Sequence, residues 1–103
     1  MYKLCFFVPA AFAEKVKQAV FETGAGRLGN YENCAWQTSG QGQFKPLAAA
    51  TPFIGSKGQL EYVEELRVEL LCTEDNVRNA VAALKRAHPY ECAAYDVVKL
   101  EDM

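Results

Sequence analysis

The chain has 103 residues, of which half are hydrophobic and 23% are charged. This length suits a single domain, and the composition is that of a globular protein rather than a disordered one. A net charge of −2 argues against a nucleic-acid-binding protein, which usually carries a basic patch. No apolar run approaches the roughly 20 residues that a membrane span needs. We therefore expect one domain over residues 1–103, with no nucleic acid and no membrane among its partners.

The first residues predict a strand, because residues 2–8 alternate between two faces. One face carries Tyr2, Leu4, Phe6 and Val8. The same stretch, followed by Ala-Phe-Ala, also resembles a signal peptide with a small-residue cleavage site. However, its charged start is thin, and Pro9 interrupts its apolar run. We favour the strand and expect the protein to be cytoplasmic.

A helix is predicted next, because apolar residues recur with helical spacing over residues 12–20 and Gly24 suits the left-handed position after a helix end. The loop at 24–29 spells G-x-G-x-x-G, the pattern of dinucleotide-binding loops. That pattern works where it follows a strand and opens a helix, whereas here it follows a helix and leads into an extended stretch over 30–38. We interpret it as a helix cap and a tight turn, in which Arg27 and free amides could hold an anion.

Residues 39–61 form a long excursion rich in glycine and proline. A structureless loop of more than about 15 residues is uncommon in a compact domain and is often functional. Its apolar side chains indicate that it packs on its own domain or on a neighbouring subunit. These side chains are Phe44, Leu47, Phe53 and Ile54.

The second half of the chain repeats the order of strand, helix and strand. Alternation over residues 65–72 predicts a half-buried strand, and helical spacing over 77–87 predicts a helix that ends before Pro89. Thr73 suits the N-cap of this helix, and residues 94–100 form the last strand. The fold class is therefore α+β, a ferredoxin-like β-α-β-β-α-β sandwich with a long excursion between its second and third strands.

Two helices can cover only one face of such a sheet. The other face still carries Cys5, Phe7 and Leu71, so we expect another subunit to cover it. The four cysteines are expected to be reduced thiols buried in strands, because they lack the close spacing of zinc ligands and the density of a disulfide framework.

No set of residues resembles a catalytic machinery, since neither a nucleophile with a base nor an activated cysteine is visible. Glu65, Arg67 and Glu69 share one strand face. We expect an ion pair there, across strands or subunits, rather than a pair of catalytic carboxylates. The only histidine, His88, begins the polar turn 88–91. We interpret it as a capping or exposed side chain, because one histidine is too few for a catalytic metal site.

Two motifs, found together in this order, are fairly specific: Gly-Ala-Gly-Arg-Leu-Gly-Asn-Tyr at 24–31 and His-Pro-Tyr-Glu at 88–91. With the stretches around them, they make the chain resemble, nearly end to end, the insert domain of the NGG-interacting-factor-like (YqfO-like) family. The matching stretches are VPAAFAEKVKQAVFETGAGRLGNYENCAW, SGQGQFKPLAAATPFIG, GQLEYVEELRVELL and AHPYECAAYD. The resemblance implies a PII-like or CutA-like fold, which is a ferredoxin-like domain that typically assembles as a trimer.

In the full-length family, the insert interrupts a larger domain that binds two metal ions, and the metal ligands lie in that larger domain. The resemblance therefore does not bring metal-dependent hydrolase or cyclohydrolase activity to what looks like a stand-alone copy of the insert. This chain also departs from the family at Cys92-Ala93, where the family commonly reads Glu-Pro. The change relaxes the start of the last strand and removes an acidic group.

Three hypotheses follow for the function. The leading one is a non-enzymatic homotrimeric binding or regulatory module of the PII/CutA-like type, with a small-ligand or anion site between subunits. The residues expected at that site are Arg27, Asn30, Tyr31, Glu69, His88, Tyr90 and Glu91. The second is a divalent-metal-binding protein with His88 and Glu91 as ligands and Cys92 as an additional candidate, the metal being the only cofactor considered. The third is a small enzyme acting on a phosphate-bearing metabolite, with Arg27 holding the phosphate.

Overall fold

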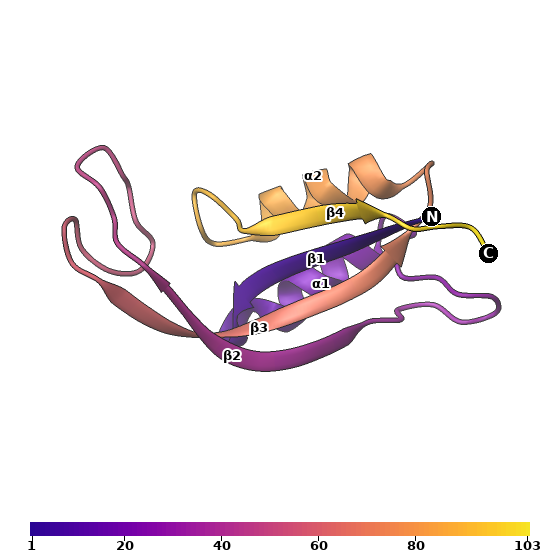
Figure 1. Cartoon of the computed structure of the whole chain (residues 1–103), viewed down its shortest axis with the longest axis horizontal. Coiled ribbons are helices and arrows are strands. Elements are labelled where there is room, and N and C mark those ends of the chain that lie inside the picture. The colour runs from indigo at the N-terminus through magenta and orange to yellow at the C-terminus, as the bar shows by residue number, and fades with distance from the viewer.

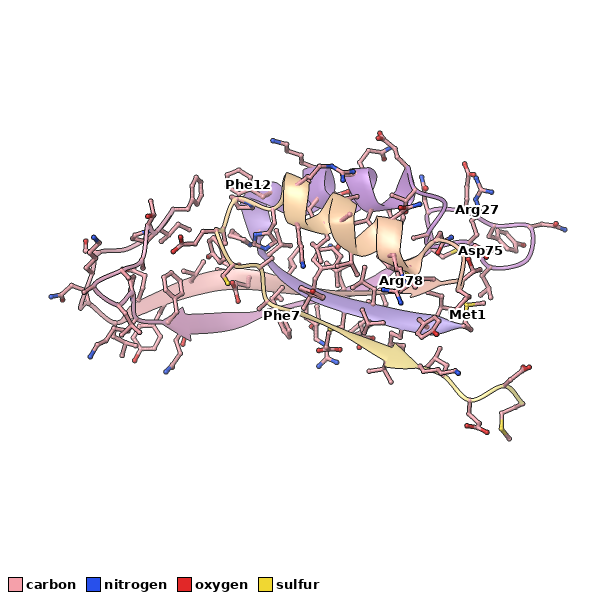
Figure 2. The ribbon with its side chains drawn as sticks, turned by 90° about the horizontal axis from the view of Figure 1, so that it is seen from above. Met1, Phe7, Phe12, Arg27, Asp75 and Arg78 are labelled. Atoms are coloured by element: carbon pink, nitrogen blue, oxygen red, sulfur yellow. The ribbon has the colours of Figure 1, made fainter.

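The computed structural model describes all residues 1–103 and contains four antiparallel strands and two α-helices (Figure 1). In chain order the elements are β1 (Tyr2–Pro9), the 3-10 turn η1 (Ala10–Phe12), α1 (Ala13–Phe21), β2 (Trp36–Phe44), β3 (Glu61–Cys72), α2 (Val77–Ala87) and β4 (Tyr95–Lys99). The strands are arranged in the order β2-β3-β1-β4, and the helices lie together on one face of the sheet (Figure 2). This is the predicted ferredoxin-like arrangement. Neither helix is long and apolar enough to cross a membrane.

The core lies between the two helices and the face of the sheet that they cover. Because strand side chains alternate, every second residue of β1 points into this layer. The fully buried β1 side chains are Leu4, Phe6 and Val8. The helices contribute their apolar stripes, which include Val16, Val20, Ala80 and Leu84. The alternation and the helical spacing seen in the sequence are thus confirmed.

The predicted position of the second strand is wrong. Residues 30–35 form a turn and a loop instead, in which Leu28 and Tyr31 exchange backbone hydrogen bonds and Asn33 adopts a φ of 57°. The strand β2 begins at Trp36 and pairs with β3 along its whole length. It is an edge strand of mostly exposed glutamine, glycine and small polar residues, so its own sequence carries no alternating pattern. Its position is set by pairing with β3, and the excursion shortens to residues 45–60.

The strands β2 and β3 continue as a two-stranded ribbon beyond the ends of β1 and β4 and carry the excursion at their far end (Figure 1). The molecule is therefore elongated, with principal extents of 46 × 24 × 24 Å. Its radius of gyration is 14.5 Å, above the ~13 Å of a compact domain of about 100 residues. The ribbon adds strand edges and surface that the two helices do not cover.

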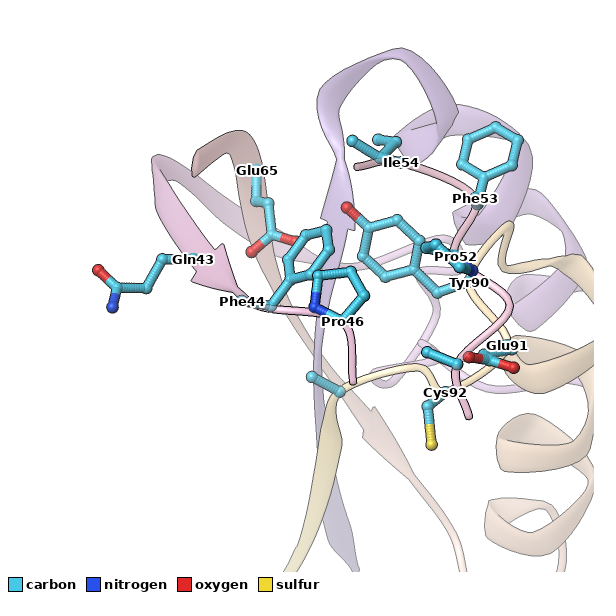
Figure 3. Close-up of a pocket in the computed structure, with 12 residues that line it drawn as sticks. Gln43, Phe44, Pro46, Pro52, Phe53, Ile54, Glu65, Tyr90, Glu91 and Cys92 are labelled. Carbon is cyan, nitrogen blue, oxygen red and sulfur yellow. The ribbon is translucent and has the colours of Figure 1, made fainter. Parts of the chain in front are cut away.

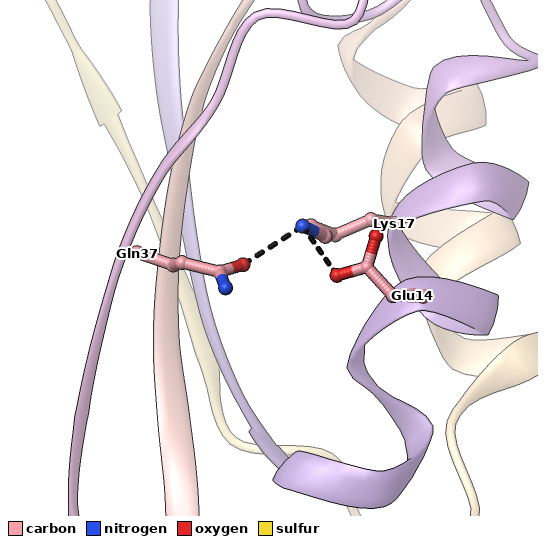
Figure 4. Close-up of polar contacts among 3 residues, drawn as sticks. All are labelled: Glu14, Lys17 and Gln37. Carbon is pink, nitrogen blue, oxygen red and sulfur yellow. Dashed lines mark hydrogen bonds and ion pairs between the residues drawn. The ribbon is translucent and has the colours of Figure 1, made fainter.

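Lys17 links the edge strand β2 to the helix layer (Figure 4). Its Nζ donates to Oε1 of Gln37 on β2 at 2.8 Å and lies 2.7 Å from Oε2 of Glu14 one turn earlier on α1. The Lys17 side chain is only 15% exposed, so this contact is better shielded than an ordinary surface ion pair. The contact holds the first residues of β2 against the helix layer.

Two local expectations need correction. The residue at the N-cap of α2 is Asn76, not Thr73, and no side-chain cap bond forms there. Instead, the Asn76 side chain turns back and accepts a hydrogen bond from the Thr73 backbone N–H at 2.9 Å. All four cysteines are free, but only Cys5 and Cys72 are buried in strands, whereas Cys34 and Cys92 lie in loops.

We predict that Leu84→Ala lowers the free energy of unfolding by about 2–5 kcal/mol, because it leaves a cavity between α2 and the sheet. Leu47→Ala serves as the control, because Leu47 is 73% exposed on the excursion and should change the stability by less than about 0.5 kcal/mol. Urea unfolding followed by circular dichroism measures both. Equal losses in the two variants would contradict the assigned core.

Candidate functional site

A cavity of about 290 Å³ lies where the excursion folds back beside the turn between α2 and β4 (Figure 3). Its apolar lining comes mainly from the end of β2, the excursion and this turn, and includes Phe44, Pro46, Pro52, Phe53 and Ile54. Glu65 on β3 and Tyr90 and Glu91 in the turn add polar groups to an otherwise apolar space. A concave apolar space with a few polar groups is the usual form of a small-molecule site.

His88 attaches the α2–β4 turn to the end of β1. It is the C-cap residue of α2, as expected, but its ring turns inward and is only 6% exposed. Its Nε2 lies 2.7 Å from the carbonyl oxygen of Phe7, and the Tyr90 backbone N–H donates to Nδ1 at 3.1 Å. Both contacts fit the neutral tautomer with the proton on Nε2. Burial lowers the pKa of His88, which keeps the ring in that neutral form.

Tyr90 forms the centre of the cavity wall. Its ring centroid lies 5.8 Å from that of Phe44 and 6.5 Å from that of Phe53, with the rings inclined rather than stacked. The Tyr90 hydroxyl is buried and has no hydrogen-bond partner. Figure 3 shows it directed toward the side of the cavity that carries Glu65 and Phe44. Burial, together with the negative charge of Glu65, raises the pKa of Tyr90.

Glu65 is the second polar group without a partner at this site. It is half-buried on β3, forms no hydrogen bond or ion pair in the chain, and burial raises the pKa of its carboxyl group. Its carboxylate occupies the space above Gly42 on the neighbouring strand, where an added Cβ would collide with it. A glycine at this position therefore leaves room for Glu65 to lie along β2 toward the cavity.

Glu91 has a structural role in the observed conformation. Its Oε1 accepts a hydrogen bond from the Thr51 backbone N–H at 2.9 Å and so links the turn to the excursion. Phe53 of the excursion also meets Phe12 edge-to-face, with ring centroids 5.4 Å apart. The excursion thus packs on its own domain, one of the two options left open by its apolar residues, although Leu47 points to solvent.

The loop between α1 and β2, which contains Arg27, Asn30 and Tyr31, lies at the opposite end of the domain from the excursion that lines this cavity (Figures 1 and 2). The Gly26 N–H attaches their loop to the end of β3, because it donates to the Leu71 carbonyl at 2.8 Å. All three side chains are exposed, and the Arg27 guanidinium is 3.9 Å from a Glu32 carboxylate oxygen. Within a single chain, the predicted site residues of this loop therefore lie far from those of the α2–β4 turn.

The glycine-rich loop has the cap-and-turn geometry that its position after a helix indicates. Gly24, Gly26 and Gly29 all have positive φ angles, and a Cβ at Gly26 would collide with the Phe21 ring. Several amides of the loop donate to backbone carbonyls within the chain, among them those of Gly26, Leu28 and Tyr31. These amides do not point at a shared anion position.

Glu69 lies in the middle of the sheet face that the helices leave uncovered. Its Oε1 accepts a hydrogen bond at 2.9 Å from the Arg67 guanidinium, two residues earlier on the same strand. The pair runs along β3, not across strands as expected. On the same face Cys5 is buried, because this short side chain of a central strand sits between Glu69 of β3 and Asp96 of β4. Phe7, also on this face, stays half-exposed.

No group of three or more histidine, cysteine, aspartate or glutamate side chains in the chain could hold a metal ion. Both ring nitrogens of His88 already have partners, and one Glu91 oxygen accepts the Thr51 amide. A metal at His88 would have to replace one of these hydrogen bonds and recruit further ligands from elsewhere.

Sequence reasoning missed most of the cavity. It identified Tyr90 and Glu91 from the polar turn but did not connect them with Phe44 or Glu65, which lie far away in the sequence. The available signals were the apolar residues of the excursion and the alternation of the third strand. They indicate packing and a shared strand face, but not that the two segments meet the same turn.

The fold matches those of solved CutA proteins. The periplasmic divalent cation tolerance protein CutA from Archaeoglobus fulgidus superimposes with a TM-score of 0.70 over 100% of this chain and 87% of that chain, at 14% identity. The PII-like protein CutA from Nostoc sp. PCC 7120 gives a TM-score of 0.69 over 98% of this chain and 82% of its own, also at 14% identity. The chain is therefore a small domain with the PII/CutA-like fold.

Closer matches come from longer proteins. Proteins named GTP cyclohydrolase 1 type 2 homolog are 45% identical in Halalkalibacterium halodurans and 41% identical in Bacillus subtilis, over 97% and 96% of this chain. A Bacillus cereus protein related to NIF3 has 40% identity and a TM-score of 0.83 over 98% of the chain. Over nearly its whole length the chain is therefore similar to one segment of NIF3-related (YqfO-like) proteins, as its motifs predict.

The chain spans about a quarter of the length of these relatives, namely 27%, 26% and 26% of the three proteins. No family model matches it. The relationship therefore concerns one domain-sized segment, and the activity in the relatives' names is that of proteins about four times as long.

We predict that His88 makes the stability depend on pH below its ordinary pKa of 6.5. In the folded chain the pKa is lowered, so the unfolded chain takes up the proton first as the pH falls, and the free energy of unfolding decreases. Well above 6.5 the ring is neutral in both states and contributes no slope.

Urea unfolding of the wild type and of His88→Gln, at pH values on both sides of 6.5, measures this contribution. The variant should be less stable at neutral pH by about 1–3 kcal/mol, because buried hydrogen bonds are lost, and its pH dependence should be flatter below 6.5. Because the pKa of Glu65 is raised, Glu65 increases the free energy of unfolding as the pH falls. This contribution is the same in the wild type and in His88→Gln, so it cancels in the comparison. Parallel pH curves would contradict the prediction.

Proposed function

We propose that this chain is a non-enzymatic homotrimeric binding module, in which identical copies cover the open face of the sheet and a small ligand binds at the edge of that interface. The observation that carries the proposal is the uncovered sheet face, which borders the cavity beside Tyr90 at Glu65. This face is formed by the residues of β2, β3, β1 and β4 that point away from the helices, and we call it the open face.

The open face has the composition of a surface that identical copies can share. It exposes Trp36 and Val98 by 63% and 51%, and Phe7 and Leu71 are half-exposed. Carboxylates of Glu69 and Asp96 alternate there with the basic groups of Lys3 and Arg67. A surface with both signs of charge among apolar groups can be complementary to a copy of itself.

The cavity borders this face. A second hollow, of about 210 Å³, lies on the open face between Phe7, Thr38 and Arg67 and shares Glu65 with the cavity. A subunit that covers the open face would therefore close one side of the ligand space. This supports a site at the boundary between subunits, which is where the leading hypothesis from the sequence expects it.

An enzymatic function is not proposed, because the cavity holds no nucleophile paired with a base. The buried His88 uses both ring nitrogens to hold the turn, and Cys92 at the cavity is exposed without an activating neighbour. The anion site at Arg27 finds less support than the cavity, since Arg27 is exposed and its nearest charged partner is a carboxylate.

We predict that Trp36→Glu and Val98→Glu dissociate the trimer, because each places a carboxylate on the open face. Val97→Glu is a matched control: Val97 is the neighbour of Val98 on β4, is 38% exposed and points to the other face of the sheet. Size-exclusion chromatography with light scattering should give a trimer for the wild type and the control, and monomers for the other two variants. A monomeric wild type would overturn the proposed assembly.

A further inference from the structure

Two polar groups without partners share the cavity. The Tyr90 hydroxyl is buried with no hydrogen bond, and the half-buried Glu65 carboxylate has neither a hydrogen bond nor an ion pair. Leaving a buried polar group unpaired costs about 1–3 kcal/mol, and a charged group costs more. Most buried polar groups in proteins are paired, so the Tyr90 hydroxyl indicates a missing partner, and the unpaired Glu65 carboxylate on the same cavity is free to bind the same ligand.

The backbone of β2 makes room for Glu65 to face the cavity. In the register of the sheet Glu65 lies opposite Gly40, but its carboxylate reaches diagonally across Gly42, two residues nearer to Phe44. Neither glycine has a side chain that would block this path. Glu65 therefore contributes a negative charge on the cavity side that faces the Tyr90 hydroxyl (Figure 3).

The rest of the lining suits a positive charge with an apolar tail. The rings of Phe44 and Tyr90 are inclined at 61° with centroids 5.8 Å apart, so a cation in the angle between them lies within about 6 Å of both rings. Phe53 adds a third ring beside Tyr90. Pro46 and Ile54 supply apolar surface without further charge. Aromatic faces attract cations, and a carboxylate among them excludes anions.

The Tyr90 hydroxyl further restricts the cation. A quaternary ammonium group has no N–H and would leave this hydroxyl unpaired, whereas a primary ammonium group has three N–H donors. One donor can reach the Glu65 carboxylate while another is accepted by the Tyr90 oxygen. The cavity volume of about 290 Å³ limits the ligand to a small molecule.

From this geometry we infer that the cavity beside Tyr90 binds a small primary alkylammonium ion, with Glu65 and Tyr90 receiving its N–H groups and the aromatic rings and prolines receiving its alkyl chain. The inference rests on the proposed binding function and names the ligand class of its site. The backbone of Tyr90 is fixed by its N–H, which donates to the buried ring of His88, and this positions the Tyr90 side chain at the cavity.

The test uses n-butylammonium, n-butanol and butyrate as probes of equal chain length and different charge. Each is titrated into the isotope-labelled protein while the backbone amide signals around Tyr90, Cys92 and Phe44 are followed by nuclear magnetic resonance. Butylammonium should shift these signals saturably, and the other two probes should bind at least about tenfold more weakly, because a charge-assisted hydrogen bond is lost. Tetramethylammonium, which has no N–H, should also bind more weakly.

Glu65→Gln should lower the affinity for butylammonium by about tenfold or more, and Tyr90→Phe should lower it several-fold. Glu64→Gln is the matched control, because Glu64 is the neighbouring carboxylate on β3, is exposed and points to the other face of the sheet. It should bind as the wild type does. Gly42→Ala should weaken binding while Glu65 is kept, because the added methyl group displaces the Glu65 carboxylate.

The outcomes separate the ligand class from the binding function. Equal binding of butanol or butyrate, with no effect of Glu65→Gln, would overturn the alkylammonium class and leave a ligand site in place. No response of the cavity signals to any probe would overturn the site itself. Loss of the trimer in Glu65→Gln, with no response of the wild type to butylammonium, would assign Glu65 to the subunit interface and overturn the inference.

Discussion

The two helices cover one face of a four-stranded sheet, and the alternation within β1 divides that strand between a closed core and an open surface. Leu4, Phe6 and Val8 are fully buried under the helices. Burying each such side chain contributes about 1.5–3 kcal/mol, which makes this the principal source of the fold's stability. The opposite residues of the strand receive no such cover. The same constraint therefore produces a closed core on one face of the sheet and an uncovered surface on the other, which the proposed trimer would cover.

The excursion does not cover the open face, because it folds over the end of the sheet. Its contacts are with Phe12, with Tyr90 and, through the Thr51 amide, with Glu91. These contacts fix the cavity walls at the point where the β2–β3 ribbon leaves the body of the domain. The sheet is covered by helices on one face only and by the excursion at one end, and this leaves both the open face and the cavity. Glu65 lines both the cavity and the neighbouring hollow on the open face.

His88 shows how the chain uses its single histidine. The ring joins the Phe7 carbonyl at the end of β1 to the Tyr90 amide in the turn, and both hydrogen bonds require a neutral ring. A charged side chain in the same place would carry a desolvation cost, which is the reason that burial lowers the pKa of His88. The histidine therefore acts as a positioning group for Tyr90 and leaves the chemistry of the cavity to other residues.

The periodicity of apolar residues in the sequence predicted those helices and strands that bury one apolar face. The strand with Phe6, the helix with Val20 and the helix with Leu84 each bury one face and show the corresponding period. The strand β2 buries almost nothing, so its position depends on hydrogen bonds to β3 that no local pattern reveals. For the same reason the turn with Tyr90 was visible as a polar motif, whereas its meeting with Glu65 was not.

The unpaired Tyr90 hydroxyl and Glu65 carboxylate at the cavity do not stabilise the fold, so their presence is better explained by a binding site. A phenylalanine at position 90 would keep the ring contacts with Phe44 and Phe53 and would remove the buried hydroxyl that lacks a partner. A glutamine at position 65 would remove a half-buried charge without changing the strand. Stability alone favours both replacements, since each removes a desolvation cost. Local costs of this kind are characteristic of binding sites, where a ligand supplies the interactions that the isolated chain lacks.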